Sequence, residues 1–201
     1  MRFPRRNKIA RSCDLDKNIK YRKILSFKPV GYWYSLGKEW YNLWYKFFDH
    51  KVTNEVICEI KVKKNMFTTL DKKEKGKILV IDSLKDVKKI FSLFGTLKII
   101  EINKNGRSVN DFRDIKLGKR KSDYDDAIIG LLDFNKISEN FSGIEFRNYK
   151  KTKKEMLLEI EKNKIKMFEY SWYDTLDVSS GCVWDLNLIE VEKKGKLKNF
   201  V

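Results

Sequence analysis

Residues 27–44 read FKPVGYWYSLGKEWYNLW, and residues 172–190 read WYDTLDVSSGCVWDLNLIE. Together these two segments contain all five tryptophans of the 201-residue chain. A tryptophan needs burial for its large apolar face and a hydrogen-bond partner for its indole N–H. Because the two segments lie at opposite ends of the chain, we expect them to meet in the fold and to enclose the functional site between them.

The length and composition of the chain favour one domain with a basic arm in front of it. With 201 residues, 42% of them hydrophobic, the chain is long enough for a single packed core. Residues 1–23 are rich in Lys and Arg and poor in apolar residues, which is typical of an arm outside a core. We therefore predict a basic arm over 1–23 and one domain over 24–201.

The spacing of apolar residues predicts both strands and helices within this domain. Residues 84–94 predict a helix, because apolar side chains recur every three or four positions after Asp82 and Ser83, which can cap it, and end at Gly95. Residues 103–123 are polar and charged, which predicts a surface insertion. The other predicted elements are strands over 24–35, 53–63, 78–81, 96–102, 141–149, 167–172 and 182–191, and helices over 38–48, 124–140 (broken near Asp133) and 150–166. Without regular βαβ alternation, these elements indicate an α+β fold.

The chain lacks the patterns of several protein classes. Its three cysteines, Cys13, Cys58 and Cys182, are widely spaced, so we expect no disulfide framework and an intracellular location, in the cytoplasm of a bacterium or host cell or in a virion. No CxxC pair is present and His50 is the single histidine, which argues against a metal site. No apolar run approaches the roughly 20 residues of a membrane-spanning helix, so we expect no membrane partner.

The net charge of +16 is the strongest global signal. An AT-rich genome explains the preference for Lys over Arg, but it does not explain the shortage of compensating Asp and Glu. A charge of this size attracts phosphate, either of a nucleic acid or of a nucleotide. The sequence therefore leaves both a polyanion partner and a nucleotide ligand open.

Three short segments resemble parts of the ADP-ribosyltransferase-like domains of bacteria and phages. FSGIEF (141–146) resembles the YDGI strand of these domains, SGCVWDLNLI (180–189) resembles their closing strand, and KPVGYWYS (28–35) is similar to their Gly-aromatic-aromatic-Ser strand. The segments also resemble uncharacterised proteins that carry KPxGxWYS, YDGIE and SGCxW. The resemblance implies a diverged member of the fold, with a split core of mixed and antiparallel sheets, and NAD as substrate without a metal.

The resemblance also implies roles for particular residues. Trp33, Tyr34 and Ser35 would hold the nicotinamide half of NAD. Ser180 stands where these enzymes carry their catalytic Glu, so Asp177 or Glu145 would supply the negative charge instead. The other residues implied to contact the cofactor are Lys28, Gly31, Ser180 and Gly181. The same side chains also fit an ordinary core strand and a tight turn that satisfies its own backbone.

Two functions of different classes remain open from the sequence. In the first, the protein is an NAD-dependent enzyme that transfers ADP-ribose to a protein or nucleic-acid acceptor. In the second, the catalytic charge has been lost, and the domain is a basic module that binds nucleic acid and accompanies a viral or phage genome. Two measurements distinguish these functions: the binding of NAD, and the dependence of nucleic-acid binding on salt concentration.

Overall fold

The protein combines two β-sheets with a group of helices. The computed structural model describes residues 8–10, 28–37, 39, 40, 43, 56–72, 74–102, 108–114, 125–162 and 164–196. The strands are β1 (Lys8–Ala10), β2 (Tyr32–Leu36), β3 (Val56–Val62), β4 (Phe67–Thr68), β5 (Ile78–Ile81), β6 (Gly95–Ile102), β7 (Ser108–Asp114), β8 (Asp125–Leu132), β9 (Gly143–Phe146), β10 (Ser180–Val183) and β11 (Ile189–Lys196). The helices are α2 (Leu84–Phe94), α3 (Phe134–Asn140), α4 (Tyr149–Glu161) and α5 (Ser171–Asp174), with short 3-10 turns η1 (Met167–Tyr170) and η2 (Leu186–Leu188).

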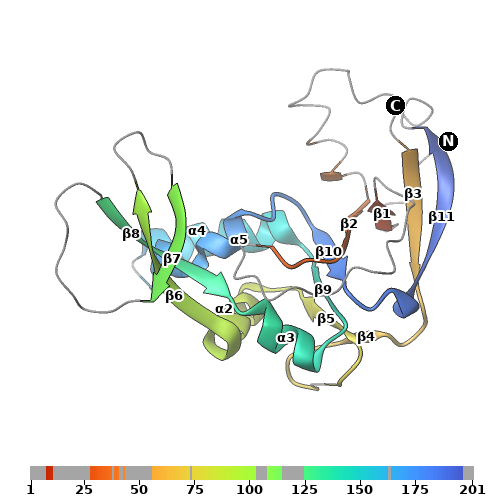
Figure 1. Ribbon diagram of the computed structural model, residues 1–201, viewed down its shortest axis with the longest axis horizontal. Helices are drawn as coiled ribbons and strands as arrows, with labels where there is room; N and C mark the ends of the chain where they lie inside the picture. Colours follow the sequence, from red (N-terminus) through yellow and green to blue (C-terminus); the bar gives the residue numbers. More distant parts are fainter. Residues whose placement is uncertain are drawn as a thin grey trace.

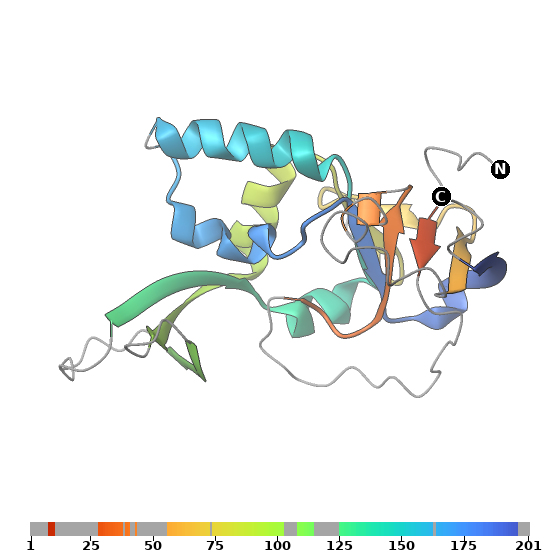
Figure 2. The same cartoon turned by 90° about the horizontal axis from the view of Figure 1, so that it is seen from above.

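The larger sheet has eight strands in the order β11-β3-β1-β2-β10-β9-β5-β4. Its strands pair antiparallel, except that β4, β5 and β9 run parallel to one another. The central strands β5, β9 and β10 are buried at every position, as expected for strands covered on both faces. Helices α2, α4 and α5 and the small sheet lie on one side of this sheet (Figures 1 and 2).

The larger sheet is curled, and a second core fills its concave side. Ile60 of β3 and Ile78 of β5 belong to one buried cluster, although four strands separate β3 from β5 in the sheet order. On the opposite face, Leu79, Ile144 and other apolar side chains join the core beneath the helices. The mixture of parallel and antiparallel strands with segregated helices confirms the predicted α+β class.

Helix α2 begins and ends as its sequence predicts. The Ser83 hydroxyl accepts a hydrogen bond from the Asp86 N–H (3.2 Å) and donates one to the Asp86 carboxylate (2.7 Å), so the first turn of the helix is capped. Gly95 follows the last residue of the helix and opens strand β6. The strand predicted over 78–81 coincides with β5.

Three predicted elements are wrong, and one range is more ordered than its composition indicates. The strand predicted over 182–191 is instead the end of β10, the 3-10 turn η2 and the start of β11. Residues 125–132 form strand β8, which pairs antiparallel with β6, instead of the first half of a helix; only 134–140 are helical, capped by Asp133. Residues 167–172 are helical turns, not a strand. Within the predicted insertion 103–123, residues 108–114 form strand β7 beside β6.

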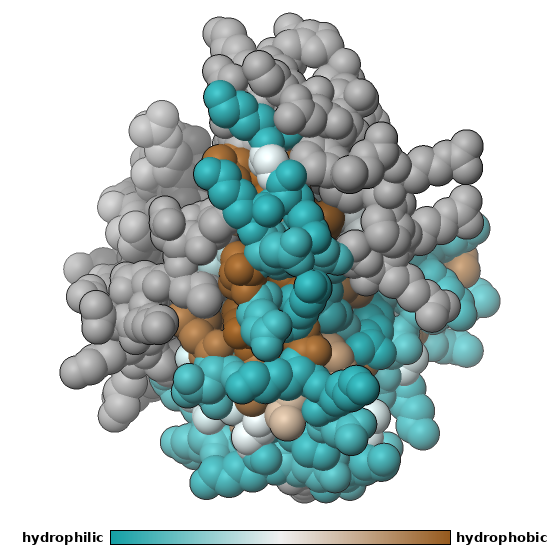
Figure 3. All heavy atoms as spheres, turned by 90° about the vertical axis from the view of Figure 1, so that its right-hand side faces the viewer, coloured by the Kyte–Doolittle hydropathy of each residue, from teal (hydrophilic) through white to brown (hydrophobic). Residues whose placement is uncertain are grey.

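Charged side chains line the outer strands of the curled sheet. Glu192 of β11 pairs with Lys61 of β3 (2.9 Å) and with Lys194 (2.6 Å), and Lys194 also reaches Glu59 of β3 (2.9 Å). Figure 3 shows the molecule from the right-hand side of Figure 1, where β3 and β11 lie. The described residues on this face are largely hydrophilic, with apolar side chains visible between the polar ones. Most of the predicted arm 1–23 and of the predicted helix 38–48, with Cys13 and His50, lies outside the described residues.

Candidate functional site

The two tryptophan-bearing segments meet in the centre of the curled sheet. Strand β2 pairs antiparallel with β10, so that Ser35 lies opposite Ser180 and Tyr34 lies opposite Gly181. On its other side β10 pairs with β9, which places Gly181 opposite Glu145. The prediction that the two segments meet is therefore confirmed.

The register divides the predicted site residues between the two faces of the sheet. Residues that lie opposite each other point to the same face, and successive residues alternate. Tyr34, Gly181 and Glu145 form one row and share the concave face. Trp33, Ser35 and Ser180 lie on the opposite face. There Trp33 packs against the core beneath the helices, and its indole N–H donates to the Pro29 carbonyl (3.1 Å).

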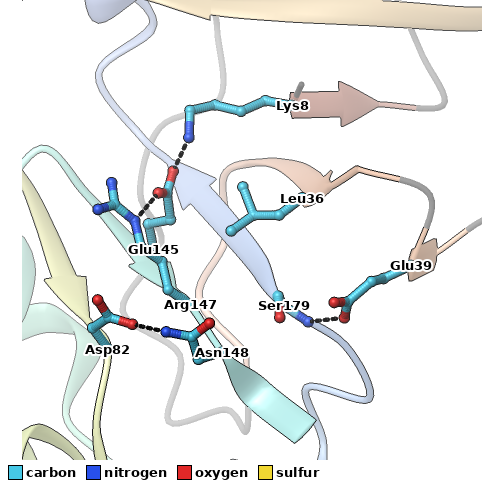
Figure 4. A pocket seen from close by; sticks show the side chains of 8 residues that line it. All are labelled: Lys8, Leu36, Glu39, Asp82, Glu145, Arg147, Asn148 and Ser179. Atoms are coloured by element: carbon cyan, nitrogen blue, oxygen red, sulfur yellow. Dashed lines mark hydrogen bonds and ion pairs between the residues drawn. The ribbon is translucent and has the colours of Figure 1, made fainter. Parts of the chain in front are cut away.

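Glu145 is the central residue of the concave face. Its side chain is 0% exposed, and its carboxylate accepts hydrogen bonds from the Tyr34 hydroxyl (2.6 Å) and from Nε of Arg147 (2.6 Å). The Lys8 ammonium forms an ion pair with the same carboxylate. Figure 4 shows Lys8 reaching Glu145 from β1 and Arg147 reaching it from just beyond the end of β9, the strand that carries Glu145. A buried carboxylate normally requires such partners, because burial of an unpaired charge is very unfavourable.

Gly181 makes the contact between Tyr34 and Glu145 possible. A Cβ atom at residue 181 would lie 2.7 Å from Cε2 of the Tyr34 ring and closer still to Cζ and the hydroxyl. The ring of Tyr34 therefore crosses over the glycine to reach the next strand. Glycine is required here for close approach, which the sequence indicated without showing what approaches.

Sequence reasoning missed both cations of the cluster, Lys8 and Arg147, and Lys8 is the more distant of the two in sequence. Strand β1 pairs with both β2 and β3, and Lys8 lies opposite Leu36 and Ile60, so a residue of the predicted arm belongs to the middle of the sheet. The Lys8 ammonium also lies 4.9 Å from the centre of the Phe67 ring, and Cζ of Arg147 lies 5.0 Å from that centre. Phe67 therefore supports both cations that hold Glu145.

The protonation states in this cluster follow from burial and charge. Burial alone would raise the pKa of Glu145, but the charges of Lys8 and Arg147 and the hydrogen bonds from Lys8 and Tyr34 outweigh it and lower that pKa below 4.5. Burial lowers the pKa of the Lys8 ammonium below 10.5, although Glu145 opposes this shift. Burial and the Glu145 charge raise the pKa of Tyr34 well above 10. At neutral pH the lowered pKa of Glu145 therefore keeps it a carboxylate, and the raised pKa of Tyr34 keeps it a neutral phenol.

A pocket of about 620 Å³ opens over this cluster. Its lining residues are Lys8, Leu36, Glu39, Asp82, Glu145, Arg147, Asn148 and Ser179 (Figure 4). Asp82 follows strand β5, and Arg147 and Asn148 follow strand β9, so the pocket lies at the carboxyl ends of two parallel strands. Ligands of α/β proteins often bind at such ends, and small-molecule pockets measure roughly 300–1,000 Å³.

Hydrogen bonds hold the rim of the pocket. The Glu39 carboxylate accepts from the Ser179 N–H (2.9 Å), and the Ser179 hydroxyl accepts from the Tyr149 N–H (3.1 Å). The Asn148 amide donates to the Asp82 carboxylate. The rim therefore carries carboxylates, whereas the floor carries cations around Glu145.

Several predicted site residues lie away from the pocket lining. Lys28 and Asp177 form an ion pair at 3.8 Å, with side chains 46% and 53% exposed. A Cβ atom at Gly31 would lie 2.6 Å from Sγ of Cys182, so this glycine allows β10 to approach. Of the two proposed carboxylates, the structure places Glu145, and not Asp177, in the pocket.

The cysteines differ in state. Cys182 is a free thiol that is completely buried, and burial raises its pKa well above 9.0. Cys58 is bonded in a disulfide, which the wide spacing of the cysteines did not predict. A protonated, inaccessible thiol is a poor nucleophile, so Cys182 belongs to the core.

Comparison with protein-family models, with curated proteins and with solved structures finds no match to this chain. Within the described ranges, no helix is long and apolar enough to cross a membrane. Among the same residues, no group of three His, Cys, Asp or Glu side chains is placed to hold a metal ion. The interpretation of the site therefore depends on its own geometry.

The Glu145 cluster should make the stability of the fold depend on pH. The pKa of Glu145 is lowered in the folded state from 4.5. Its ion pairs therefore contribute fully to the free energy of unfolding above about pH 4.5, and this contribution is lost as pH falls through the folded-state pKa. We expect the difference in free energy of unfolding between wild type and Glu145→Gln to stay constant from about pH 7 to about pH 5 and to shrink below about pH 4.5. Urea denaturation at fixed pH values measures this difference. A difference that persisted unchanged to about pH 2 would contradict the assignment.

Proposed function

We propose that the protein is an ADP-ribosyltransferase that binds NAD in the pocket over Glu145. The observation that carries the proposal is the fully buried Glu145 carboxylate, held at the pocket floor by Tyr34, Lys8 and Arg147. A perturbed, buried ionisable group in a pocket is a functional-site candidate. The sequence resemblance to ADP-ribosyltransferase-like domains also supports the proposal. The three segments that carry it hold β2, β10 and β9, which are neighbours in the sheet.

The chemistry of ADP-ribose transfer suits a fixed carboxylate. Nicotinamide leaves C1′ of the ribose with the electron pair of the broken bond, and the sugar passes through an oxocarbenium-like transition state with positive charge. The acceptor atom then forms the new bond to C1′ and loses its proton to water. A carboxylate already oriented toward that charge stabilises it without reorganisation. Glu145 would play this role, with its orientation fixed by the Tyr34 hydroxyl.

The two cations of the cluster suit the diphosphate of NAD. Arginine binds phosphate oxygens through two donors, and lysine binds them as a point charge. The Arg147 side chain is 36% exposed and Lys8 is 15% exposed, so both are accessible from the pocket. The diphosphate would bind the parts of these cations that face the pocket, while both cations keep their contacts with Glu145.

The test compares the two candidate carboxylates with radiolabelled NAD. We expect Asp177→Asn to keep NAD binding and transfer within about twofold of wild type, because this exposed side chain forms a surface ion pair with Lys28 and such pairs contribute little. Equilibrium dialysis measures binding, and release of nicotinamide measures turnover. If Asp177→Asn abolished turnover while Glu145→Gln preserved it, the carboxylate assignment would be wrong. If the wild type neither bound nor cleaved NAD, the proposed function would be wrong.

The second candidate function, a non-catalytic module that binds nucleic acid, is favoured by the net charge of +16. This function does not account for the buried carboxylate of Glu145 in a pocket, since a basic surface that binds phosphates needs no internal carboxylate. We therefore place it second as a complete function. Nucleic-acid binding is also compatible with transfer, and one surface of the protein is suited to it.

A further inference from the structure

Helix α4 presents a lysine-rich face to solvent at the end where the helix begins. Lys150, Lys151 and Lys154 are exposed there. Lys151 lies 3.8 Å from Glu155, whereas Lys150 and Lys154 form no ion pair with any residue in the described ranges. The first turn of α4 contains no acidic residue. Among the described residues, acidic side chains therefore neutralise only part of the positive charge at this end of the helix.

These lysines lie where they weaken the helix. The amino end of a helix carries a partial positive charge, so cations in the first turn are unfavourable by a few tenths of a kcal/mol each. Lys150 and Lys154 are also four residues apart, where like charges repel. An anion bound across this face would offset both effects. The face thus has charge complementarity to a polyanion, in a chain whose net charge is +16.

The lysine face begins at the edge of the pocket. Asn148, the residue before α4, lines the pocket, and the N–H of Tyr149 donates to the pocket residue Ser179 (3.1 Å). The helix leads away from the sheet on the side that carries α2 and α5 (Figure 2). A polymer bound along the start of α4 would therefore pass the pocket mouth.

We propose that Lys150, Lys151 and Lys154 bind the phosphate backbone of a single-stranded nucleic acid, which is the acceptor of ADP-ribose. A base inside a duplex cannot enter a pocket, so enzymes that act on bases use single strands or extruded nucleotides. The acceptor nitrogen or oxygen forms the bond to C1′ as nicotinamide leaves with its electron pair, and the acceptor proton passes to water. The acceptor role rests on the proposed function, whereas the binding does not.

Leu157 and Leu158, which are exposed on the same helix (42% and 44%), do not belong to the proposed surface. Leucine has no π face on which a base can stack, unlike the aromatic residues of single-strand-binding proteins. The contacts would therefore be to phosphates, with little base preference and a strong dependence on salt. An anionic membrane or an acidic protein would instead use these leucines together with the lysines.

The test measures binding of a labelled oligothymidylate to the full chain by fluorescence anisotropy over a series of salt concentrations. The slope of log K against log salt is negative, and each lost phosphate contact makes it less steep by about 0.7 for a single strand. We therefore expect a slope about 2 less steep for the triple variant Lys150→Gln, Lys151→Gln, Lys154→Gln. This corresponds to about a hundredfold weaker binding than wild type near 0.1 M salt, and the two affinities should converge toward 1 M salt.

A matched variant controls for the loss of net charge. Lys64, Lys193 and Lys196 are exposed, and strand β11, which carries two of them, lies at the far end of the molecule from α4 (Figures 1 and 2). We expect their triple substitution by Gln to leave the slope within about 0.5 of wild type. Equal weakening by both triples would overturn the proposal, because it would show only a general effect of charge.

Further experiments test for other partners of the lysine face and distinguish failure of this proposal from failure of the proposed function. Loss of oligonucleotide binding on Leu157→Ser with Leu158→Ser, or binding to phosphatidylserine vesicles but not to the oligonucleotide, would overturn the proposal. The α4 triple variant should retain the circular dichroism spectrum and the NAD affinity of wild type. If wild type binds the oligonucleotide through α4 but does not bind NAD, the proposed function fails and the binding surface stands.

Discussion

Glu145→Gln is expected to reduce nicotinamide release and ADP-ribosyl transfer by about a thousandfold. Glutamine preserves the shape of the side chain and can still accept the Tyr34 hydroxyl hydrogen bond, but it carries no charge. Loss of one preorganised electrostatic group of this kind typically costs a factor of about 10² to 10³ in turnover. Steady-state turnover with radiolabelled NAD measures the loss. The substitution should affect turnover more than NAD binding, because the positive charge develops only in the transition state.

The same substitution should also destabilise the fold, so stability and turnover have to be separated. Removing the Glu145 charge leaves the Lys8 ammonium, whose side chain is 15% exposed, without its partner, at a cost of about 3 kcal/mol. Adding Lys8→Met removes the uncompensated charge and should recover most of this stability. It should not recover turnover. Recovery of turnover in the double variant would contradict a chemical role for Glu145.

Gly181→Ala is expected to destabilise the protein by about 3 to 5 kcal/mol and to abolish turnover. The new methyl group overlaps the Tyr34 ring, and overpacking of a buried site costs about 1 to 3 kcal/mol. Displacement of the ring also breaks the hydrogen bond from Tyr34 to Glu145 (2.6 Å), and a hydrogen bond to a charged group contributes about 1.5 to 3 kcal/mol. Urea denaturation measures the free energy of unfolding.

Two comparisons identify the cause of this effect. Tyr34→Phe removes only the hydroxyl and should cost about 1.5 to 3 kcal/mol, less than Gly181→Ala. Tyr34→Leu combined with Gly181→Ala replaces the ring with a smaller side chain, so it should be more stable than Gly181→Ala alone. Additive destabilisation in this double variant would mean that the methyl group and the ring do not compete for one space.

The parts of the fold that the sequence predicts well are those that local patterns specify. Helix α2 has a capping serine, a regular apolar face and a terminal glycine, and its bounds agree with the structure. The apolar run of β5 is equally local. Glu145 was one of two candidate carboxylates, because a resemblance can place a strand but cannot show which face of the sheet holds the pocket. That choice required the register of β9, β10 and β2.

The failures have identifiable physical causes. In β8, Ile128, Ile129, Leu131 and Leu132 are spaced so that they fit a helix as well as a strand. Strand β8 is defined by its pairing with β6, and at Gly130 a Cβ atom would overlap the backbone of Glu169; both contacts are remote in sequence. Lys8 was missed for a similar reason, since a three-residue strand in a basic segment is specified only by its partners β2 and β3.

The pairing of both outermost chain segments with β3 has a consequence for synthesis of the protein. Strands β1 and β11, which lie far apart in the sequence, flank β3, and the row that seats Glu145 requires both β2 (Tyr32–Leu36) and β10 (Ser180–Val183). A ribosome delivers the amino-terminal strands first, at about 5–20 residues per second. The carboxylate therefore gains its complete set of neighbouring strands only after β10 (Ser180–Val183) has been synthesised, and products truncated before β10 would have no assembled site.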